Sequence, residues 1–301
     1  MLPLPLGEGK GEGPPHPDSY IYSLVLELRP REPATLPATH GYQAFALVLQ
    51  MLERSDPALS RQLHDLAGPK PLTVSPLRGK PAGRGGGLAL RPEEVCWLRL
   101  TVLREELFAR LLAALLRPAG EDGLRLGPAT FALERIVTAP GQSPWAGCAS
   151  YGALLAAAAP PARLGLRFLT PTVFRSGGQR NVALPLPGLV FGSLLARWNE
   201  FSPLPLPAEL RAAAEEGLLI ARYSLQTRLL DFGRYKEIGF VGECEYEPAP
   251  GLPPETAGQL AALAAFAFYA GVGAKTSMGM GQTVEVNGGG SLRGRTGGHA
   301  A

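Results

Sequence analysis

The sequence predicts an α+β fold made of two tandem ferredoxin-like domains, and three observations lead to this prediction. The chain has 301 residues, which is more than one average domain needs. Hydrophobic residues make up 46% of it, enough to bury a core in each of two domains. Segments typical of strands and helices follow the same order twice, and that order is the one of a ferredoxin-like fold.

We expect the first domain over residues 20–145 and the second over residues 155–286. Residues 1–19 and 287–301 are rich in glycine, with prolines in the first, and are predicted to be disordered tails. No apolar run is long enough to span a membrane, and the N-terminal tail lacks the continuous apolar stretch of a signal peptide. We therefore expect a cytoplasmic protein.

The charge and the cysteine content narrow the class of protein only slightly. The chain carries 29 basic and 26 acidic residues, and a net charge of +3 permits an anionic partner without requiring one. Its three cysteines lie far apart, which fits a reducing compartment and no disulfide framework. No Cys/His cluster has the spacing of metal ligands, so we predict neither a metal site nor a cofactor.

The first domain is predicted to begin with a strand at 20–30, which is rich in β-branched and aromatic residues. A helix follows within 35–56, with Thr39 as its N-cap and apolar residues at helical spacing. A second, short helix starts at Asp56-Pro57, because proline is tolerated in a first turn. The remaining elements are strands at 71–79, 95–103, 124–126 and 131–137 and a helix at 104–117.

The second domain is predicted to begin with a strand at 162–174. Two helices follow, one bounded by prolines at 184–201 and one at 207–221. The segments 222–232 and 236–248 are expected to pair as strands. A long helix at 253–273 then leads to a closing strand at 281–286.

The most informative stretch is "GVGAKTSMGMGQ", in which four glycines surround Lys275. These glycines are Gly271, Gly273, Gly279 and Gly281. The stretch fits neither a P-loop nor a dinucleotide fingerprint, because the glycine spacing and the flanking elements differ from both motifs. A helix-to-strand turn remains, whose exposed amides and single cation can pack against a sugar–phosphate backbone. The alternative is a glycine C-cap followed by a loose turn.

This glycine loop resembles the C-terminal glycine-rich loop of the RAMP superfamily. More narrowly, the chain is similar over about residues 20–286 to the CRISPR-associated endoribonucleases that process precursor CRISPR RNA. Supporting stretches occur in the order that the family shows, and they are "LPATHGYQAFALVLQML", "LTVSPLRG", "SPWAGCASYGALL", "FLTPTVFRSGGQ" and "WNEFSP". The resemblance implies two RAMP/RRM-like domains, binding of CRISPR repeat RNA and cleavage without a metal ion. A homodimer is a further candidate assembly.

Metal-independent RNA cleavage uses the 2′-hydroxyl beside the scissile phosphate and leaves a 2′,3′-cyclic phosphate and a 5′-hydroxyl. Histidine suits the proton transfers because its unperturbed pKa lies near neutrality. His16 and His299 lie in the tails, and His64 lies near a helix end, where the macrodipole favours it. His40 lies at the start of the first helix, where the family carries its catalytic histidine, and is the candidate. The alternative is a helix residue packed against a loop.

The sequence indicates the residues that would assist the catalytic histidine less clearly than the histidine itself. Some family members add a tyrosine and a lysine near the histidine, but the first helix here carries no lysine. Tyr42 is the candidate helper, with a core aromatic as the alternative, whereas Tyr22 is predicted to lie in the core. Lys275 can stabilise charge on the phosphate, and the alternative is a solvated loop cation.

Further RNA contacts are predicted at basic residues of the second domain. Arg222, Arg228, Arg234 and Lys236 all have even numbers, so those on one strand share a face, unless a turn breaks the register. Arg175 and Arg180 flank "SGGQ", a candidate hairpin tip for an RNA groove or loop. Each of these cations has a solvated surface position as its alternative. No RNP-type aromatic motif is present, so base stacking on an open sheet is not predicted.

Three functions follow from these observations. The expected one is a site-specific endoribonuclease on CRISPR repeat RNA, with His40 and Tyr42 in its site. The second is a non-catalytic RAMP subunit that binds guide RNA in a CRISPR effector complex. The third is a small-molecule enzyme with an unrelated glycine turn. The glycine loop suits the first two functions, and His40 at the helix start favours the enzyme.

Overall fold

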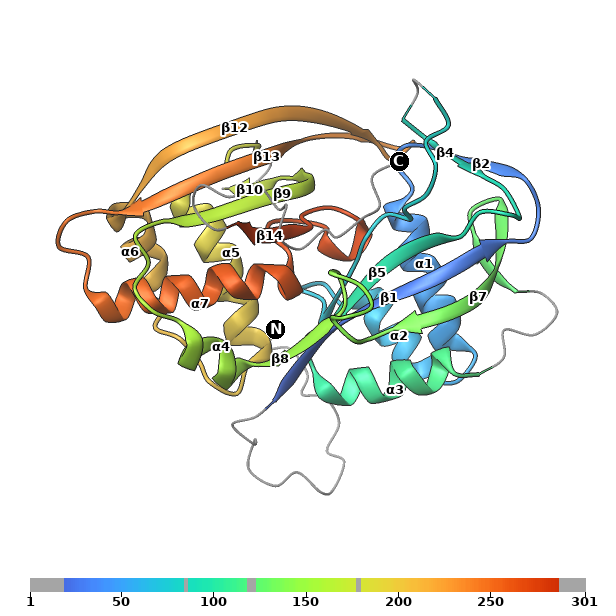
Figure 1. Cartoon of the computed structure of the whole chain (residues 1–301), viewed down its shortest axis with the longest axis horizontal. Coiled ribbons are helices and arrows are strands. Elements are labelled where there is room, and N and C mark those ends of the chain that lie inside the picture. The colour runs from blue at the N-terminus through green and yellow to red at the C-terminus, as the bar shows by residue number, and fades with distance from the viewer. Residues whose placement is uncertain (1–18, 84–85, 118–122, 177–179, 287–301) are drawn as a thin grey trace.

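The computed structural model of the chain describes residues 19–83, 86–117, 123–176 and 180–286. The tails predicted at 1–19 and 287–301 lie outside these ranges, except for Ser19. Two antiparallel sheets stand side by side along the long axis of the molecule, each with helices packed against it (Figure 1). The predicted α+β fold of two tandem ferredoxin-like units is confirmed.

The first sheet has the strand order β3-β5-β1-β7-β6, and β8 extends it by pairing with β1. Its strands are β1 (Tyr20–Pro30), β3 (Leu72–Val74), β5 (Cys96–Val102), β6 (Leu124–Leu126), β7 (Ala129–Val137) and β8 (Gly147–Ser150). The helices of this unit are α1 (Gly41–Glu53), α2 (Pro57–Asp65) and α3 (Glu105–Leu115). Alternate apolar residues of the strands and the apolar stripes of these helices form one buried cluster.

The second sheet has the strand order β12-β13-β9-β14. Its strands are β9 (Leu164–Thr172), β12 (Leu218–Asp231), β13 (Lys236–Pro248) and β14 (Thr283–Val286). The helices of this unit are α4 (Tyr151–Ala157), α5 (Pro187–Phe201), α6 (Leu210–Gly217) and α7 (Pro254–Ala270). Tyr151, Trp198 and Phe266 meet in the core with ring centroids 5.0 to 5.6 Å apart, so aromatic contacts join α4, α5 and α7.

Two small hairpins lie outside the main sheets. The first joins β2 (Ala34–Leu36) to β4 (Leu88–Leu90), and neither strand was predicted. The second joins β10 (Phe174–Ser176) to β11 (Arg180–Val182), which confirms the predicted hairpin. The tip of this second hairpin, at 177–179, lies outside the described residues.

A buried arginine fastens the first sheet to the end of α7. Arg99 on β5 donates from Nε to the Ser23 hydroxyl at 2.8 Å and from Nη2 to the backbone oxygen of Phe268. The guanidinium also lies over the Phe268 ring, 3.8 Å from its centroid. Burial lowers the pKa of this guanidinium, yet the carbonyl end of a helix and an aromatic face both favour a cation.

Hydroxyl and amide groups extend this junction on both sides of Arg99. Thr101 donates to the backbone oxygen of Tyr269 at 2.6 Å. Gln282, which directly precedes β14, donates to the Thr73 hydroxyl at 3.2 Å. Because these groups are buried, leaving any of them unpaired would cost free energy, so the contact between the two units is specific in its register.

Several local predictions need correction. His40, not Thr39, is the N-cap of α1, because the helix begins at Gly41. The Thr39 hydroxyl instead accepts a hydrogen bond from the Asp231 amide at 3.1 Å. The helix predicted at 207–221 ends at Gly217, where the chain enters the long edge strand β12. Tyr22 is only partly buried and stacks on Phe108 with centroids 3.7 Å apart.

The segment between the two predicted domains is not a plain linker. It contains β8, which joins the first sheet, and the start of α4, which packs on α7. The proposed domain division therefore stays a prediction. Within the described ranges, no helix combines the length and the hydropathy that crossing a membrane requires.

Replacing Arg99 by methionine should loosen the junction between the two sheets. The change leaves the Phe268 oxygen without its buried donor and removes the bond to the Ser23 hydroxyl, which keeps only its bond to the Trp145 oxygen. We therefore expect a loss of about 2–4 kcal/mol in the free energy of unfolding. Urea unfolding at neutral pH measures this loss. Arg135→Met, which removes an exposed pair with Glu27, is the control and should shift the midpoint far less. An Arg99 variant as stable as the parent would contradict the assignment.

Candidate active site

The start of α1 touches the glycine loop, backbone against backbone. A Cβ atom placed on Gly41 would lie 2.1 Å from the backbone oxygen of Met278, and one on Gly279 would lie 2.9 Å from the Gly41 Cα atom. Real Cβ atoms do not approach other atoms so closely, so only glycine fits at both positions. The contact places His40, which directly precedes Gly41, beside the loop.

The imidazole of His40 is 4% exposed and faces two backbone oxygens. Its Nδ1 atom lies 2.7 Å from the Pro37 oxygen, and its Nε2 atom lies 3.2 Å from the Leu77 oxygen. A neutral imidazole carries one N–H and can donate to only one of them. His40 is therefore at the helix start, as predicted, but its ring is covered by two chain segments rather than turned to the surface.

The glycine loop has the backbone geometry that its composition predicts. Its four glycines all have positive φ, and Lys275 is the only described non-glycine residue with positive φ, at 57°. A short 3-10 turn, η1 (Thr276–Met278), follows the lysine before β14 begins. A left-handed backbone costs a lysine more than a glycine, so surrounding contacts must hold Lys275 in this conformation.

The amides of the loop are not exposed as predicted. Gly271 donates to the Ala267 oxygen, Gly281 donates to the Pro171 oxygen, and Gly273 donates to the Ser193 hydroxyl at 2.9 Å. Three of the four glycines are buried, and Gly273 is half-buried. The expectation failed because β9 and α5 cover the loop, and sequence alone does not show which neighbour supplies the hydrogen-bond partners.

Two side chains of α5 bond to the backbone of Gly273, one to its amide and one to its carbonyl oxygen. Besides the Ser193 hydroxyl, Arg197 donates from Nη2 to the Gly273 oxygen at 2.8 Å. Arg197 is 7% exposed, and burial lowers its pKa. Sequence reasoning missed both residues. The only signal was an arginine inside an apolar helix, which by itself does not reveal its partner.

Lys275 is not a solvated loop cation. Its ammonium forms an ion pair with Glu237 of β13, whose other oxygen accepts from Asn181 of β11 at 2.9 Å. The ammonium also lies 4.8 Å from the Phe232 ring centroid and 4.3 Å from the Tyr235 ring centroid. The lysine therefore joins the glycine loop to the tip of the β12–β13 hairpin.

The β12–β13 hairpin reaches across to the start of α1. The Asp231 amide donates to the Thr39 hydroxyl, and the Phe232 ring lies 6.2 Å from the Tyr42 ring. Tyr42 is 38% exposed, and its hydroxyl accepts a hydrogen bond from the side-chain amide of Gln43 at 3.1 Å. The fold thus gathers the predicted residues His40, Tyr42 and Lys275 with Gly279 into one junction.

The predicted basic stripe is only partly formed. Arg222 and Arg228 do lie on one face of β12, but Arg222 pairs with Glu245 at 2.8 Å and Arg228 donates to Gln226. Arg234 falls in the turn, so it leaves the register. Lys236 lies 3.7 Å from the Asp231 carboxylate. Acidic partners therefore offset two of the four charges.

The remaining basic candidates lie on the β10–β11 hairpin. Arg175 is exposed, and its backbone pairs with Asn181. The backbone of Arg180 pairs with that of Ser176 beside the tip, which lies outside the described residues.

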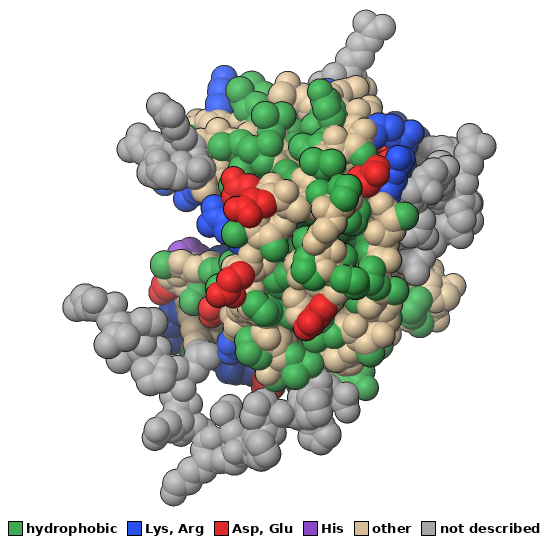
Figure 2. All heavy atoms as spheres, turned by 90° about the vertical axis from the view of Figure 1, so that its left-hand side faces the viewer, with side chains coloured by type: hydrophobic (Ala, Val, Ile, Leu, Met, Phe, Trp, Pro, Cys, Tyr) green, Lys and Arg blue, Asp and Glu red, His purple; other side chains and the backbone are tan. Residues whose placement is uncertain are grey.

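The end of the second unit that faces the viewer in Figure 2 is not a basic surface. Acidic side chains are scattered there among hydrophobic and uncharged ones, and Lys and Arg side chains lie toward the margins of the view.

The other candidates for proton transfer are remote from this junction. His64 is exposed in the last turn of α2 and lies 2.7 Å from the Asp65 carboxylate, as its position predicted. His16 and His299 lie outside the described residues. Burial and Glu105 raise the pKa of Tyr22 to about 12, so its hydroxyl stays protonated at neutral pH. In the described part of the chain, no three His, Cys, Asp or Glu residues are grouped as metal ligands.

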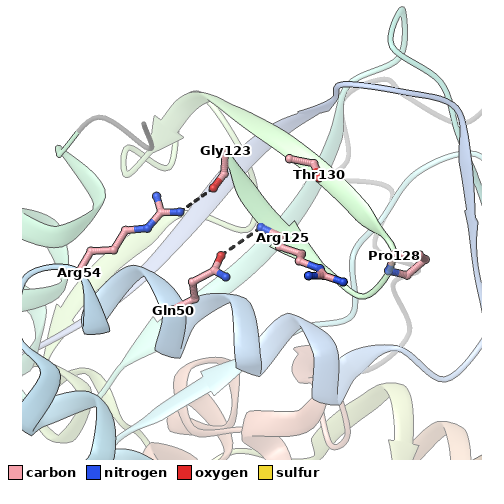
Figure 3. Close-up of a pocket in the computed structure, with 6 residues that line it drawn as sticks. All are labelled: Gln50, Arg54, Gly123, Arg125, Pro128 and Thr130. Atoms are coloured by element: carbon pink, nitrogen blue, oxygen red, sulfur yellow. Dashed lines mark hydrogen bonds between the residues drawn. The ribbon is translucent and has the colours of Figure 1, made fainter. Parts of the chain in front are cut away.

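A hollow lies at the opposite end of α1 (Figure 3). Arg54 donates to the Gly123 oxygen at 2.7 Å, and Gln50 accepts from the Arg125 amide at 3.1 Å. These bonds tie β6 and the residue before it to the end of the helix. Arg54 is fourteen residues from His40, which is about 20 Å along a helix, so the hollow is separate from the junction.

Comparison with known proteins agrees with the fold. The sequence model of "CRISPR-associated endoribonuclease Cas6" matches residues 166–283, and that of the "CRISPR Cas6 N-terminal domain" matches residues 20–156. A search of curated proteins found no match. A Cas6-related protein from Pyrococcus furiosus, 14% identical with a TM-score of 0.55 over 89% of this chain and 99% of that chain, shows the fold alone.

Two solved Cas6 proteins are more similar. The Thermus thermophilus Cas6 structure is 32% identical with a TM-score of 0.69, covering 89% of this chain and 99% of that chain. A product complex of the same Cas6 is 35% identical with a TM-score of 0.74, covering 89% and 100%. A product complex of a second Cas6 is 33% identical with a TM-score of 0.70, covering 89% and 100%. The chain therefore belongs to the CRISPR-associated endoribonuclease Cas6 family of RAMP-type, RNA-binding proteins.

Proposed function

We propose that this chain cleaves CRISPR repeat RNA without a metal ion, by attack of a 2′-hydroxyl on the adjacent phosphorus. The products are a 2′,3′-cyclic phosphate and a 5′-hydroxyl. The observation that carries the proposal is the contact between Gly41 and Gly279, which brings His40 beside the glycine loop. Similar Cas6 proteins have been solved as a product complex and as a substrate mimic complex.

His40 is the proposed general base. The shorter of its two contacts, from Nδ1 to the Pro37 oxygen, fits an Nδ1–H donor, which leaves a lone pair on Nε2. That lone pair then faces the Leu77 oxygen, which is also an acceptor, so Nε2 is better matched by a ribose hydroxyl. RNA must displace the segment around Leu77 to reach it. A similar Cas6 has been solved as a histidine-to-alanine mutant.

Tyr42 and Lys275 are the proposed helpers. The Tyr42 oxygen accepts from Gln43, so its own O–H can donate to a phosphate oxygen. Lys275 retains ammonium protons beyond the one directed at Glu237, and these can approach the charge that develops on the phosphate. The glycines of the loop and the basic residues Arg175, Arg180, Arg228, Arg234 and Lys236 stay predicted RNA contacts. A homodimer also stays a prediction.

The low exposure of His40 is the observation that favours the alternative function, a RAMP subunit that binds guide RNA without cleaving it. A RAMP subunit that only binds guide RNA would have no use for an accessible general base, and His40 is 4% exposed. Endoribonuclease activity on repeat RNA decides between the two. Protein in excess that binds the RNA and leaves it intact would support the alternative.

His40→Ala should reduce single-turnover cleavage of repeat RNA by about 10²- to 10⁴-fold, because general acid–base catalysis contributes about that much. RNA affinity should stay within about threefold, since the buried ring adds no surface charge. His64→Ala, which changes an exposed histidine, is the control and should cleave like the parent. His40→Gln keeps a hydrogen-bonding side chain in case the alanine variant unfolds. Equal rates for all variants would remove His40 from the mechanism.

Gly41→Ala should slow cleavage without destabilising the helix α1 itself. Alanine is a better helix former than glycine, so any loss reports the contact with Met278 and Gly279. We expect at least a tenfold slower single-turnover rate, because a displacement of about 1 Å at a reacting group can cost about 10²-fold. Gly68→Ala, at a glycine with no atom near its Cβ position, is the control.

Cleavage should continue at an unchanged rate in excess EDTA, and the upstream product should carry a 2′,3′-cyclic phosphate. Mass spectrometry of the product identifies that end group. A substrate with a single 2′-deoxyribose at the cleaved position should bind and stay intact, because it lacks the nucleophile. Loss of cleavage in EDTA that returns with a divalent ion would contradict the metal-independent mechanism.

A further inference from the structure

The tip of the β12–β13 hairpin carries a pair of stacked aromatic rings. Phe232 and Tyr235 lie with centroids 4.9 Å apart and planes inclined by 17°. The turn is closed by hydrogen bonds from the Phe232 amide to the Tyr235 oxygen and from the Gly233 amide to the Asp231 carboxylate. A closed turn and a stacked pair make the tip a preformed aromatic surface rather than a loose loop.

One ring of this pair is exposed without an evident packing role. Tyr235 is 47% exposed, and neither ring belongs to a buried cluster of the described residues. Phe232 accounts for the packing of the tip, because it faces both Tyr42 and Lys275. Tyr235 contacts Phe232 and the Lys275 ammonium, so roughly half of its surface has no partner.

The aromatic pair is fixed next to the proposed site of cleavage. The Asp231 amide is bonded to Thr39, the residue before His40, and Phe232 lies 6.2 Å from Tyr42. On its other side the pair holds the Lys275 ammonium, which Glu237 anchors. Any RNA whose scissile phosphate reaches His40 therefore brings its neighbouring nucleotides past the hairpin tip.

We propose that Tyr235, supported by Phe232, is a stacking platform for one unpaired nucleobase beside the cleaved phosphate. This inference rests on the proposed function. An aromatic ring stacks on any of the four bases, so the platform selects an unstacked nucleotide rather than a particular base. Holding one base out of the A-form stack also turns the backbone beside it, which in-line attack by a 2′-hydroxyl requires.

The test combines a variant of the platform with an altered RNA. Tyr235→Leu should weaken binding of a non-cleavable, 2′-deoxy repeat RNA by about 5- to 100-fold, the range for loss of one stacked base. Tyr235→Phe keeps the ring and should restore affinity to within about twofold. Tyr223→Leu, which removes a tyrosine that is 68% exposed on the same hairpin, is the matched control and should bind like the parent.

An abasic scan of the RNA separates stacking from a merely structural role. At one position next to the cleaved bond, removing the base should weaken binding to the parent protein and make Tyr235→Leu cost nothing further. A 2-aminopurine at that position should lose fluorescence on binding to the parent and keep it with Tyr235→Leu. A structural defect in the hairpin would instead weaken binding equally for every abasic RNA.

The outcomes distinguish this inference from the function on which it rests. Failure of the parent protein to bind or cleave repeat RNA would overturn both. Cleavage that depends on His40, together with the same affinity for Tyr235→Leu and parent, would overturn the platform alone. An affinity loss that no abasic position cancels would also overturn it, because the loss would then not come from a base.

Discussion

The end of α7 decides where the glycine loop lies, and a buried cation holds that end. Arg99 and Thr101 of β5 bond to the backbone oxygens of Phe268 and Tyr269, the last residues before the helix stops. Because the partners are carbonyls at the negative end of a helix dipole, the arginine needs no carboxylate to remain buried and charged. The loop that follows α7 is thereby positioned against the first sheet, although it belongs to the second unit.

The glycines of the loop matter mainly because they have no side chain. Gly279 and Gly41 let two backbones meet where any side chain would collide, and the positive φ values let the chain turn tightly between α7 and β14. The loop amides bond within the protein, to α7, β9 and α5. The glycine-rich loop therefore also acts through packing, because it lets the start of α1 and its histidine approach the second unit.

The loop lysine at the junction is paired rather than free. Lys275 is held by Glu237 and by two aromatic rings, and farther along β12, away from the junction, Arg222 is held by Glu245. Such pairs orient the cations and reduce long-range attraction to phosphates. If the proposed function holds, recognition of RNA at this junction depends more on shape and on exposed aromatic and hydroxyl groups than a count of basic residues suggests. Tyr42 and Tyr235 are two exposed aromatic residues of this junction.

The sequence by itself determined the two-unit α+β fold, nearly every main strand and helix, and the residue at the start of α1. These features follow from local spacing, such as the apolar repeat that includes Phe45 and Val48, which acts within a few residues. Only the tertiary structure decided that Thr39 binds the hairpin tip, that Lys275 meets Glu237 and that α5 closes over Gly273. Each of these contacts joins residues far apart in the chain, and no local pattern records which distant atom a polar group will find.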